Sequence, residues 1–114
     1  MKLAAAVGTA LLVSGCSSEV VLSIPAAPIP VKQIGALRQV ASGAKLAEPL
    51  EYSDPIRAPD SSQYPWIVCI RSDATDRSRQ QPYSVFYDGA LKDSRLSALN
   101  EGCATATYHP LPQK

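Results

Sequence analysis

The sequence contains few of the side chains that most often carry out enzymatic chemistry. Its 114 residues include one histidine, one tryptophan, one phenylalanine and three cysteines. It has no phosphate-binding glycine loop, no GxSxG or HExxH motif, no nucleotide fingerprint and no EF-hand loop. A serine nucleophile needs a base beside it, and the single histidine, His109, stands next to Pro110 near the C-terminus. The sequence therefore predicts a protein that is not an enzyme and has no cofactor.

The chain also has no excess of charge of either sign. Eleven Lys and Arg residues stand against ten Asp and Glu residues, for a formal net charge of +1. Binding of nucleic-acid phosphates needs a concentrated excess of cations, so we expect no nucleic-acid partner. Carboxylate pairs such as Asp73 with Asp76 and Asp88 with Asp93 are common in polar loops. We predict no metal site.

No hydrophobic run is long enough to cross a bilayer, which takes about 20 residues. The apolar run at residues 3–13 is shorter; it follows Lys2 and precedes small residues, an order typical of an export signal. The stretch Val13-Ser14-Gly15-Cys16 resembles the lipobox of bacterial lipoproteins. That resemblance implies that residues 1–15 are a signal peptide, cleaved before Cys16, and that Cys16 carries lipid, including acyl chains such as palmitate.

The same resemblance implies where the protein works. Ser17 follows the lipidated cysteine, and in lipoproteins of the enterobacterial type a residue other than Asp at this place accompanies sorting to the outer membrane. We therefore expect a protein of the cell envelope, held by lipid on Cys16, in the outer membrane and facing the periplasm.

Lipid on Cys16 would leave Cys69 and Cys103 as the remaining cysteines. An exported protein lies in an oxidising compartment, so this pair predicts a structural disulfide. Free thiols are the alternative; zinc would need further ligands, and a catalytic thiol would need an activating neighbour that neither local sequence supplies. On the chain-entropy model a bridge over this separation is worth nearly 4 kcal/mol.

Residues 16–63 are rich in proline, which breaks helices and strands. They predict a mostly disordered tether with a root-mean-square reach of roughly 35 to 40 Å. Within it, apolar residues at helical spacing predict a short helix at 31–47, despite Gly35 and Gly43. Val20 to Ile24 could add a strand to an exposed sheet edge.

Residues 64–114 predict a small α+β domain. Alternating residues from Trp66 to Arg71 and the aromatic run 83–87 predict strands; the turn Asp88-Gly89 leads to a possible third strand at 90–92. Asp93 or Ser94 could cap a helix at 95–101. The apolar residues Leu96, Leu99 and Cys103 would share one face of this helix, and that face would pack on the strands. The predicted fold is an antiparallel sheet of two to four strands packed against one helix, with one disulfide.

The spacing of Trp66-Ile67-Val68-Cys69, Tyr83-Ser84-Val85-Phe86, Ser94-Arg95-Leu96, Cys103 and Tyr108-His109-Pro110-Leu111 resembles that of short exported alphaproteobacterial proteins of unknown function. This resemblance implies no activity. We expect a non-catalytic lipoprotein that presents its domain to an envelope protein or peptidoglycan. The alternative is a periplasmic ligand-binding or inhibitory module with a groove near Trp66, Tyr83 and Arg95. Trp66 would be either a buried core anchor or an exposed aromatic platform.

Overall fold

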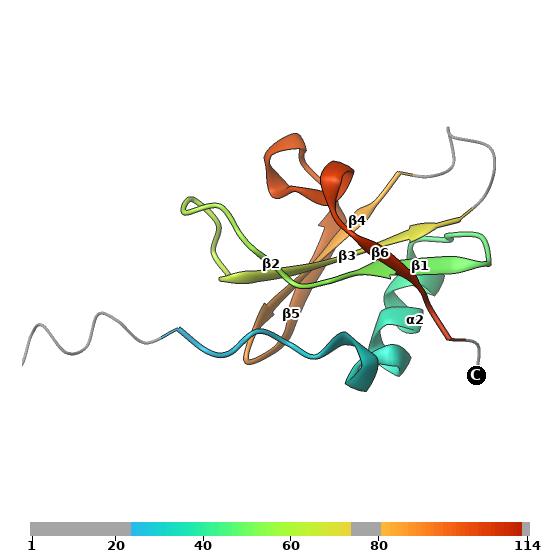
Figure 1. Cartoon of the computed structure of the whole chain (residues 1–114), viewed down its shortest axis with the longest axis horizontal. Coiled ribbons are helices and arrows are strands. Elements are labelled where there is room, and N and C mark those ends of the chain that lie inside the picture. The colour runs from blue at the N-terminus through green and yellow to red at the C-terminus, as the bar shows by residue number, and fades with distance from the viewer. Residues whose placement is uncertain (1–23, 74–80, 113–114) are drawn as a thin grey trace, which may run out of the picture.

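A computed structural model describes residues 24–73 and 81–112 (Figure 1). The lipobox, Cys16 and most of the 20–24 segment lie outside these residues, as does much of the polar loop at 72–82. The elements in chain order are η1 (Pro30–Lys32), α2 (Ile34–Gly43), β1 (Leu50–Ser53), β2 (Ile56–Arg57), β3 (Trp66–Ser72), β4 (Tyr83–Asp88), β5 (Ala90–Leu96), η3 (Leu99–Glu101), η4 (Cys103–Thr105) and β6 (Tyr108–Pro110).

The strands form one antiparallel sheet of six, larger than the predicted two to four. Its order is β5-β4-β3-β1-β6, with β2 paired to one end of β3. Strands β3 and β4 form a long antiparallel pair in the middle of the sheet, in which Trp66 lies opposite Tyr87 and Ile70 lies opposite Tyr83. The turn at Gly89, which adopts a left-handed φ of 80°, then returns the chain as the edge strand β5. The predicted class, a small antiparallel sheet with one helix and one disulfide, is confirmed.

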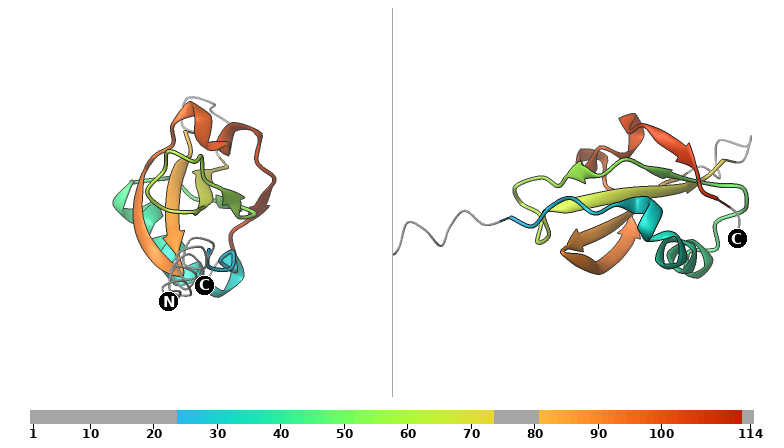
Figure 2. Two further views of the ribbon diagram at one scale, coloured as in Figure 1. Left: turned by 90° about the vertical axis from the view of Figure 1, so that its left-hand side faces the viewer. Right: turned by 60° about the horizontal axis from the view of Figure 1, so that its bottom comes forward.

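Both faces of the sheet are covered, and each has its own core. Val68, Ile70, Val85 and Tyr87 pack with residues of α2 on one face. Ile67, Cys69 and Phe86 pack with Cys103 on the other, under the segment that carries η3 and η4. Two views agree that α2 and the segment 97–105 lie on opposite sides (Figures 1 and 2). This double burial explains the unbroken apolar run 67–70 in β3.

The helix on the sheet is α2, inside the stretch predicted to be a tether. Leu37 has no exposed surface and Ala41 is 2% exposed. A ten-residue helix is marginal alone, so this packing supplies most of its stability. The structure thus contains a helix within the predicted 31–47, begun by the 3-10 turn at Pro30 and shorter than expected.

The second predicted helix, at 95–101, is wrong. β5 continues through Arg95, opposite Ser84, to Leu96, opposite Tyr83, because the β4 ladder offers those backbone groups partners. The Ser97 N–H then bonds to the Pro82 carbonyl. The predicted apolar helix face does not form: Leu96 is 50% exposed and Leu99 is 99% exposed.

The described part of the predicted tether is ordered and belongs to the domain. β1 lies inside the sheet, between β3 and β6, so the sheet begins well before the boundary predicted at Tyr64. Even Pro25 is bound, since the Trp66 indole Nε1–H donates to its carbonyl at 2.9 Å. The prolines in this stretch separate short elements: Pro55 lies between β1 and β2, where no ladder N–H is required. A long flexible reach therefore does not apply to residues 25–63.

Candidate functional site

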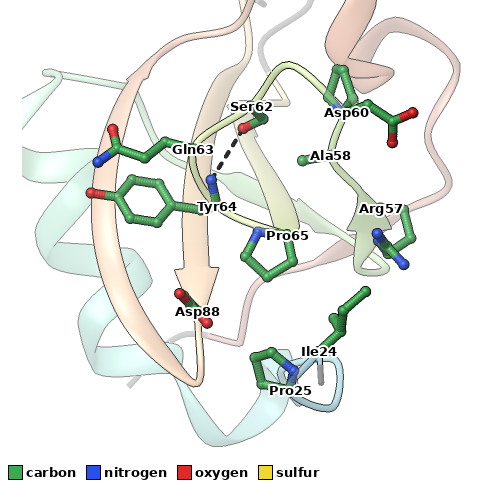
Figure 3. Close-up of a pocket in the computed structure, with 11 residues that line it drawn as sticks. Ile24, Pro25, Arg57, Ala58, Asp60, Ser62, Gln63, Tyr64, Pro65 and Asp88 are labelled. Atoms are coloured by element: carbon green, nitrogen blue, oxygen red, sulfur yellow. Dashed lines mark hydrogen bonds between the residues drawn. The ribbon is translucent and has the colours of Figure 1, made fainter. Parts of the chain in front are cut away.

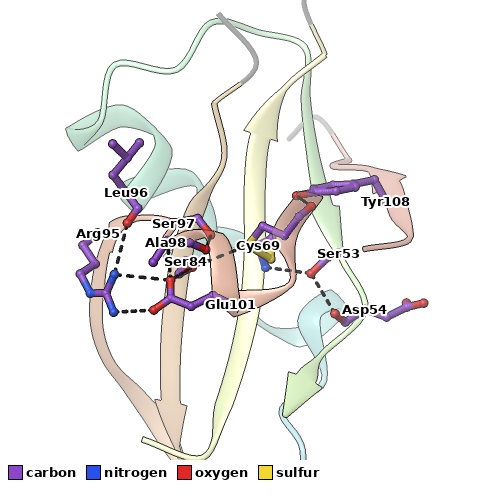
Figure 4. Close-up of a disulfide and its surroundings, with 11 residues drawn as sticks. Ser53, Asp54, Cys69, Ser84, Arg95, Leu96, Ser97, Ala98, Glu101 and Tyr108 are labelled. Carbon is purple, nitrogen blue, oxygen red and sulfur yellow. Dashed lines mark hydrogen bonds and ion pairs between the residues drawn. A yellow bond between two sulfur atoms is a disulfide. The ribbon is translucent and has the colours of Figure 1, made fainter. Parts of the chain in front are cut away.

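The disulfide predicted between Cys69 and Cys103 is present. It joins the middle of β3 to η4, with Cα atoms 5.7 Å apart, and both cysteines are buried. The Cys69 N–H donates to the Ser53 hydroxyl at 2.8 Å, which fixes β3 against β1 beside the bridge (Figure 4). The bridge therefore ties the segment 97–105 covalently to the centre of the sheet.

A polar network beside the disulfide holds the same segment. Glu101 is 4% exposed, and its carboxylate accepts from the Ser84 hydroxyl at 2.8 Å and from the Ala98 N–H at 2.9 Å. Arg95 forms the ion pair with Glu101 and lies 4.8 Å over the Phe86 ring. Figure 4 shows these groups converging from β4, β5 and η3. The network fixes the chain path between β5 and the disulfide.

These contacts set the ionisation of Glu101. Burial alone disfavours the carboxylate, but the Ala98 N–H, the Ser84 hydroxyl and the Arg95 guanidinium all favour it. The balance holds the pKa of Glu101 below its ordinary value. The group is therefore a fixed anion at neutral pH, satisfied by three partners, and it acts as an anchor for the segment.

The network and the disulfide together present an apolar projection. Leu99 is 99% exposed, and Leu96 beside it is 50% exposed. Both border a hollow of about 240 Å³, which Pro82, Ala98 and Ala104 also line. Gly102 allows the turn that follows, because its φ of 89° is a conformation that other residues rarely adopt. We call Leu96, Leu99 and this hollow the Leu99 surface.

The structure does not bring Trp66, Tyr83 and Arg95 together. Trp66 and Tyr83 both pack on the α2 face, but Trp66 pairs with Tyr87, which is four residues along β4 from Tyr83, about 13 Å. Arg95 lies over Phe86, on the disulfide face. The single groove expected from these residues is therefore not formed.

Each of these three residues has its own surroundings. Trp66 is partly buried; it bonds to Pro25 and has the Arg57 guanidinium 5.4 Å from its ring centroid, so it is a packed anchor more than an open platform. Tyr83 borders a hollow of about 500 Å³ between α2 and β5, with Val40 and Leu91. Arg95, half exposed, supports the Leu99 surface.

A second polar group lies on the disulfide face, at the β1–β6 edge. Arg71 bonds to Glu51 at 2.8 Å and lies 3.7 Å over the Tyr108 ring. The Tyr108 hydroxyl donates to the Cys103 carbonyl at 2.9 Å. Burial chiefly raises the pKa of Tyr108 to about 12, with Arg71 lowering it and Glu51 raising it. His109, at the same edge, pairs with Asp54 at 2.7 Å.

A third hollow, of about 290 Å³, lies where the described chain begins (Figure 3). It is lined by Ile24 and Pro25 on one side and by the loop between β2 and β3 on the other. Arg57, Asp60 and Asp88 place charges of both signs around it. Figure 3 shows the loop stabilised by the bond from the Tyr64 N–H to the Ser62 hydroxyl.

Within residues 24–73 and 81–112, no three His, Cys, Asp or Glu side chains gather as metal ligands would. Nor does this part of the chain contain a helix of the length and apolarity needed to span a membrane.

The sequence did not reveal the roles of Glu101 and Leu99, which were both assigned to a helix. The spacing of Leu96, Leu99 and Cys103 fits a helical face, and nothing local shows that Ser84 would meet Glu101. In comparisons with known proteins, no protein-family model, curated protein or solved structure matches this chain.

Proposed function

We propose that this protein is a non-catalytic lipoprotein of the cell envelope that presents the Leu99 surface to another envelope component. Lipid on Cys16 would hold it in the outer membrane, facing the periplasm, and the partner would be an envelope protein or peptidoglycan. The observation that carries the proposal is the almost complete exposure of Leu99 on a segment held by a disulfide and by the contacts of the buried Glu101 carboxylate.

A single exposed leucine is ordinary on a protein surface. Leu99 differs because the chain around it is held in place by the buried carboxylate of Glu101 and by the bridge at Cys103. A side chain presented on a pre-ordered segment loses less conformational entropy on binding than one on a mobile loop. An apolar projection beside a hollow is also the shape of a small interface core, into which a partner's side chains can pack.

The Glu101 network supports the same proposal. Only the Glu101 carboxylate is buried, and burying a charge costs solvation free energy, so we infer that it is present because its contacts hold one chain conformation. Here the conformation that it holds is the one that presents Leu99. The alternative proposal, a ligand groove near Trp66, Tyr83 and Arg95, has less support because these residues lie on two faces of the sheet.

Site-specific crosslinking in the native envelope tests the interaction. A photoactivatable amino acid is placed at position 99, and a matched control is placed at Lys92, an exposed residue of the edge strand β5. We expect one discrete adduct from position 99, lost when Leu96→Asp is added, and none from position 92. Identical adducts from both positions, or no adduct from position 99, would count against the proposed surface.

The lipid anchor is tested separately. Cys16→Ser should abolish labelling by palmitate and leave the protein unprocessed or released from the membrane, because no sulfur remains to carry lipid. Lys92→Ser is a suitable control on the described chain, since it alters an exposed residue outside the lipobox and away from the start of the described chain. Full processing and membrane retention of Cys16→Ser would exclude the lipoprotein assignment.

A further inference from the structure

The exposed large apolar side chains of the described residues fall into two groups. Leu96 and Leu99 form the Leu99 surface. The other three, Ile24, Ile29 and Val31, are 52%, 51% and 59% exposed and lie within the first nine described residues. We call residues 24–32 the entry segment. Its apolar residues need an explanation of their own, because none of them lines the hollow beside Leu99.

The entry segment is docked on the domain at both ends. Near its start, the Pro25 carbonyl accepts from Trp66, which packs with the α2-side core. At its end, the 3-10 turn η1 leads directly into α2, which Leu37 fixes in that core. The apolar side chains of the segment are thus exposed although its backbone is held.

The entry segment and the Leu99 surface lie on opposite sides of the molecule. In Figure 1 the segment runs along the bottom, in blue to cyan, and η3 and η4 lie at the top; the turned view in Figure 2 keeps them apart. The cores agree, since Trp66 belongs to the α2 face and Cys103 to the other.

The charged residues of the entry segment and of the helix that follows it have one sign, although Asp60 and Asp88 lie near Ile24 at its start. Residues 24–47 contain the cations Lys32, Arg38 and Lys45 and no Asp or Glu. Arg38 is paired with Glu48, while Lys32 and Lys45 are exposed. Exposed cations beside apolar side chains suit a surface of anionic lipid headgroups, which attracts Lys and Arg and accepts apolar groups at its boundary.

The short link between Cys16 and Ile24 also favours contact between the entry segment and the membrane. Eight residue steps separate Cys16 from Ile24, and a chain of that length spans at most about 29 Å. A compact domain of about 80 residues has a radius of gyration of about 12 Å, and hence a diameter of about 30 Å. The link joins the domain at the entry segment, so the entry segment is the described part of the domain whose distance from the anchor is most tightly limited.

We propose that the entry segment lies on the anionic lipid surface to which Cys16 is anchored, through Ile24, Ile29, Val31 and Lys32. The membrane contact orients the domain so that the Leu99 surface faces away from the bilayer. This inference rests on the lipid anchor of the proposed function. It replaces the distant, freely moving domain that a long tether would give.

Fluorescence quenching by brominated lipid tests the contact. The full-length lipidated protein is reconstituted into vesicles of phosphatidylethanolamine and phosphatidylglycerol with bromine on the acyl chains. Two variants each add one tryptophan to the natural Trp66: Ile29→Trp on the entry segment and Leu99→Trp as the matched control. The quenching of the added emission is obtained by subtracting the emission of the unaltered protein.

We expect the added emission of Ile29→Trp to fall about twofold in brominated vesicles, because short-range quenching needs contact with the acyl boundary. That of Leu99→Trp should not change. Adding Val31→Asp to Ile29→Trp should remove the quenching while leaving the thermal unfolding midpoint in place, since Val31 is exposed. Replacing phosphatidylglycerol by phosphatidylcholine should weaken it, because Lys32 loses its anionic partner.

Other outcomes overturn the inference in distinguishable ways. Equal quenching at positions 29 and 99, or none at position 29, would exclude a membrane contact of the entry segment. An unquenched Ile29→Trp whose emission shifts with protein concentration would identify a second copy of the chain as the occupant. Palmitate labelling and retention after a carbonate wash report the anchor independently: their loss refutes anchor and contact together, whereas their presence without quenching at position 29 refutes only the contact.

Discussion

The substitution Glu101→Gln isolates the charge of the buried network. Glutamine has the shape of glutamate, so its oxygen can still accept from Ser84 and from the Ala98 N–H, which lie 2.8 and 2.9 Å from the carboxylate. The amide nitrogen, however, would face the Arg95 guanidinium, donor against donor. The variant therefore removes the ion pair and weakens two hydrogen bonds without opening a cavity.

The expected loss follows from those contacts. Hydrogen bonds to a charged group contribute about 1.5–3 kcal/mol and neutral ones about 1 kcal/mol, so the two retained bonds weaken by about 1 kcal/mol together at least. Arg95 is 51% exposed, so solvent screening limits the ion pair to at most about 1 kcal/mol. We expect the free energy of unfolding to fall by about 2 kcal/mol. In a domain of this size such a loss lowers the thermal unfolding midpoint by roughly 10 °C.

The assay is urea unfolding of the oxidised protein at pH 7 and at acid pH, with Glu48→Gln as the control. Glu48 is 52% exposed and pairs with Arg38, so its variant should differ from the natural protein by less than about 0.5 kcal/mol. The folded-state pKa of Glu101 is lowered, so its stabilisation is present above the unfolded pKa and is lost as the pH falls through the folded one. The natural protein and Glu101→Gln should therefore converge in acid.

Two results would refute this reasoning. A loss at pH 7 no larger than that of Glu48→Gln would mean that the charge of Glu101 does not hold the segment. A loss of about 2 kcal/mol that persists unchanged at acid pH would mean that the loss comes from the amide nitrogen placed against Arg95 and not from removal of the carboxylate charge.

Three further predictions concern the bridge, the helix and the tyrosines. Cys103→Ser should lower the free energy of unfolding by about 4 kcal/mol on the chain-entropy model, measured by urea unfolding; an unchanged melting temperature on reduction of the natural protein would contradict it. Leu37→Ala should cost about 2–5 kcal/mol in the same assay if α2 is part of the core, whereas a removable tether would show no change. Burial raises the pKa of Tyr87 to about 12, as it does for Tyr108. These folded-state pKa values exceed the ordinary 10.0, so the stability that the two neutral phenols contribute is complete below pH 10 and is lost as the pH rises to 12. Ultraviolet absorbance of the phenolate forms of these two residues should therefore appear together with loss of circular dichroism.

The parts of the fold that local pattern could predict are the central strands and the bridge. Aromatic and β-branched residues at 66–71 and 83–87 favour extended chain, and Asp88-Gly89 supplies the turn between β4 and β5. The Cys69–Cys103 pairing followed from counting cysteines, given the resemblance of residues 13–16 to a lipobox.

The parts that were mistaken depend on partners distant in the sequence. Residues 95–101 have helical spacing, but the β4 ladder and the Ser84–Glu101 bond favour a strand followed by 3-10 turns. Residues 50–57 look like tether because prolines surround them, yet their backbone groups pair with β3 and β6. Tertiary pairing overrides local propensity wherever a sheet edge offers unpaired N–H and C=O groups.

The sequence by itself determined the antiparallel β3–β4 centre, the disulfide and a helix within residues 31–47, because each depends on spacing, turn chemistry or residue count. Only the tertiary structure decided that this helix belongs to the domain, that Glu101 is a buried anion, and that Leu99 and the entry segment lie on opposite sides. Those features depend on which side of the sheet each side chain lies on. Strand register determines this, and the packing of a separate core on each side of the sheet selects the register.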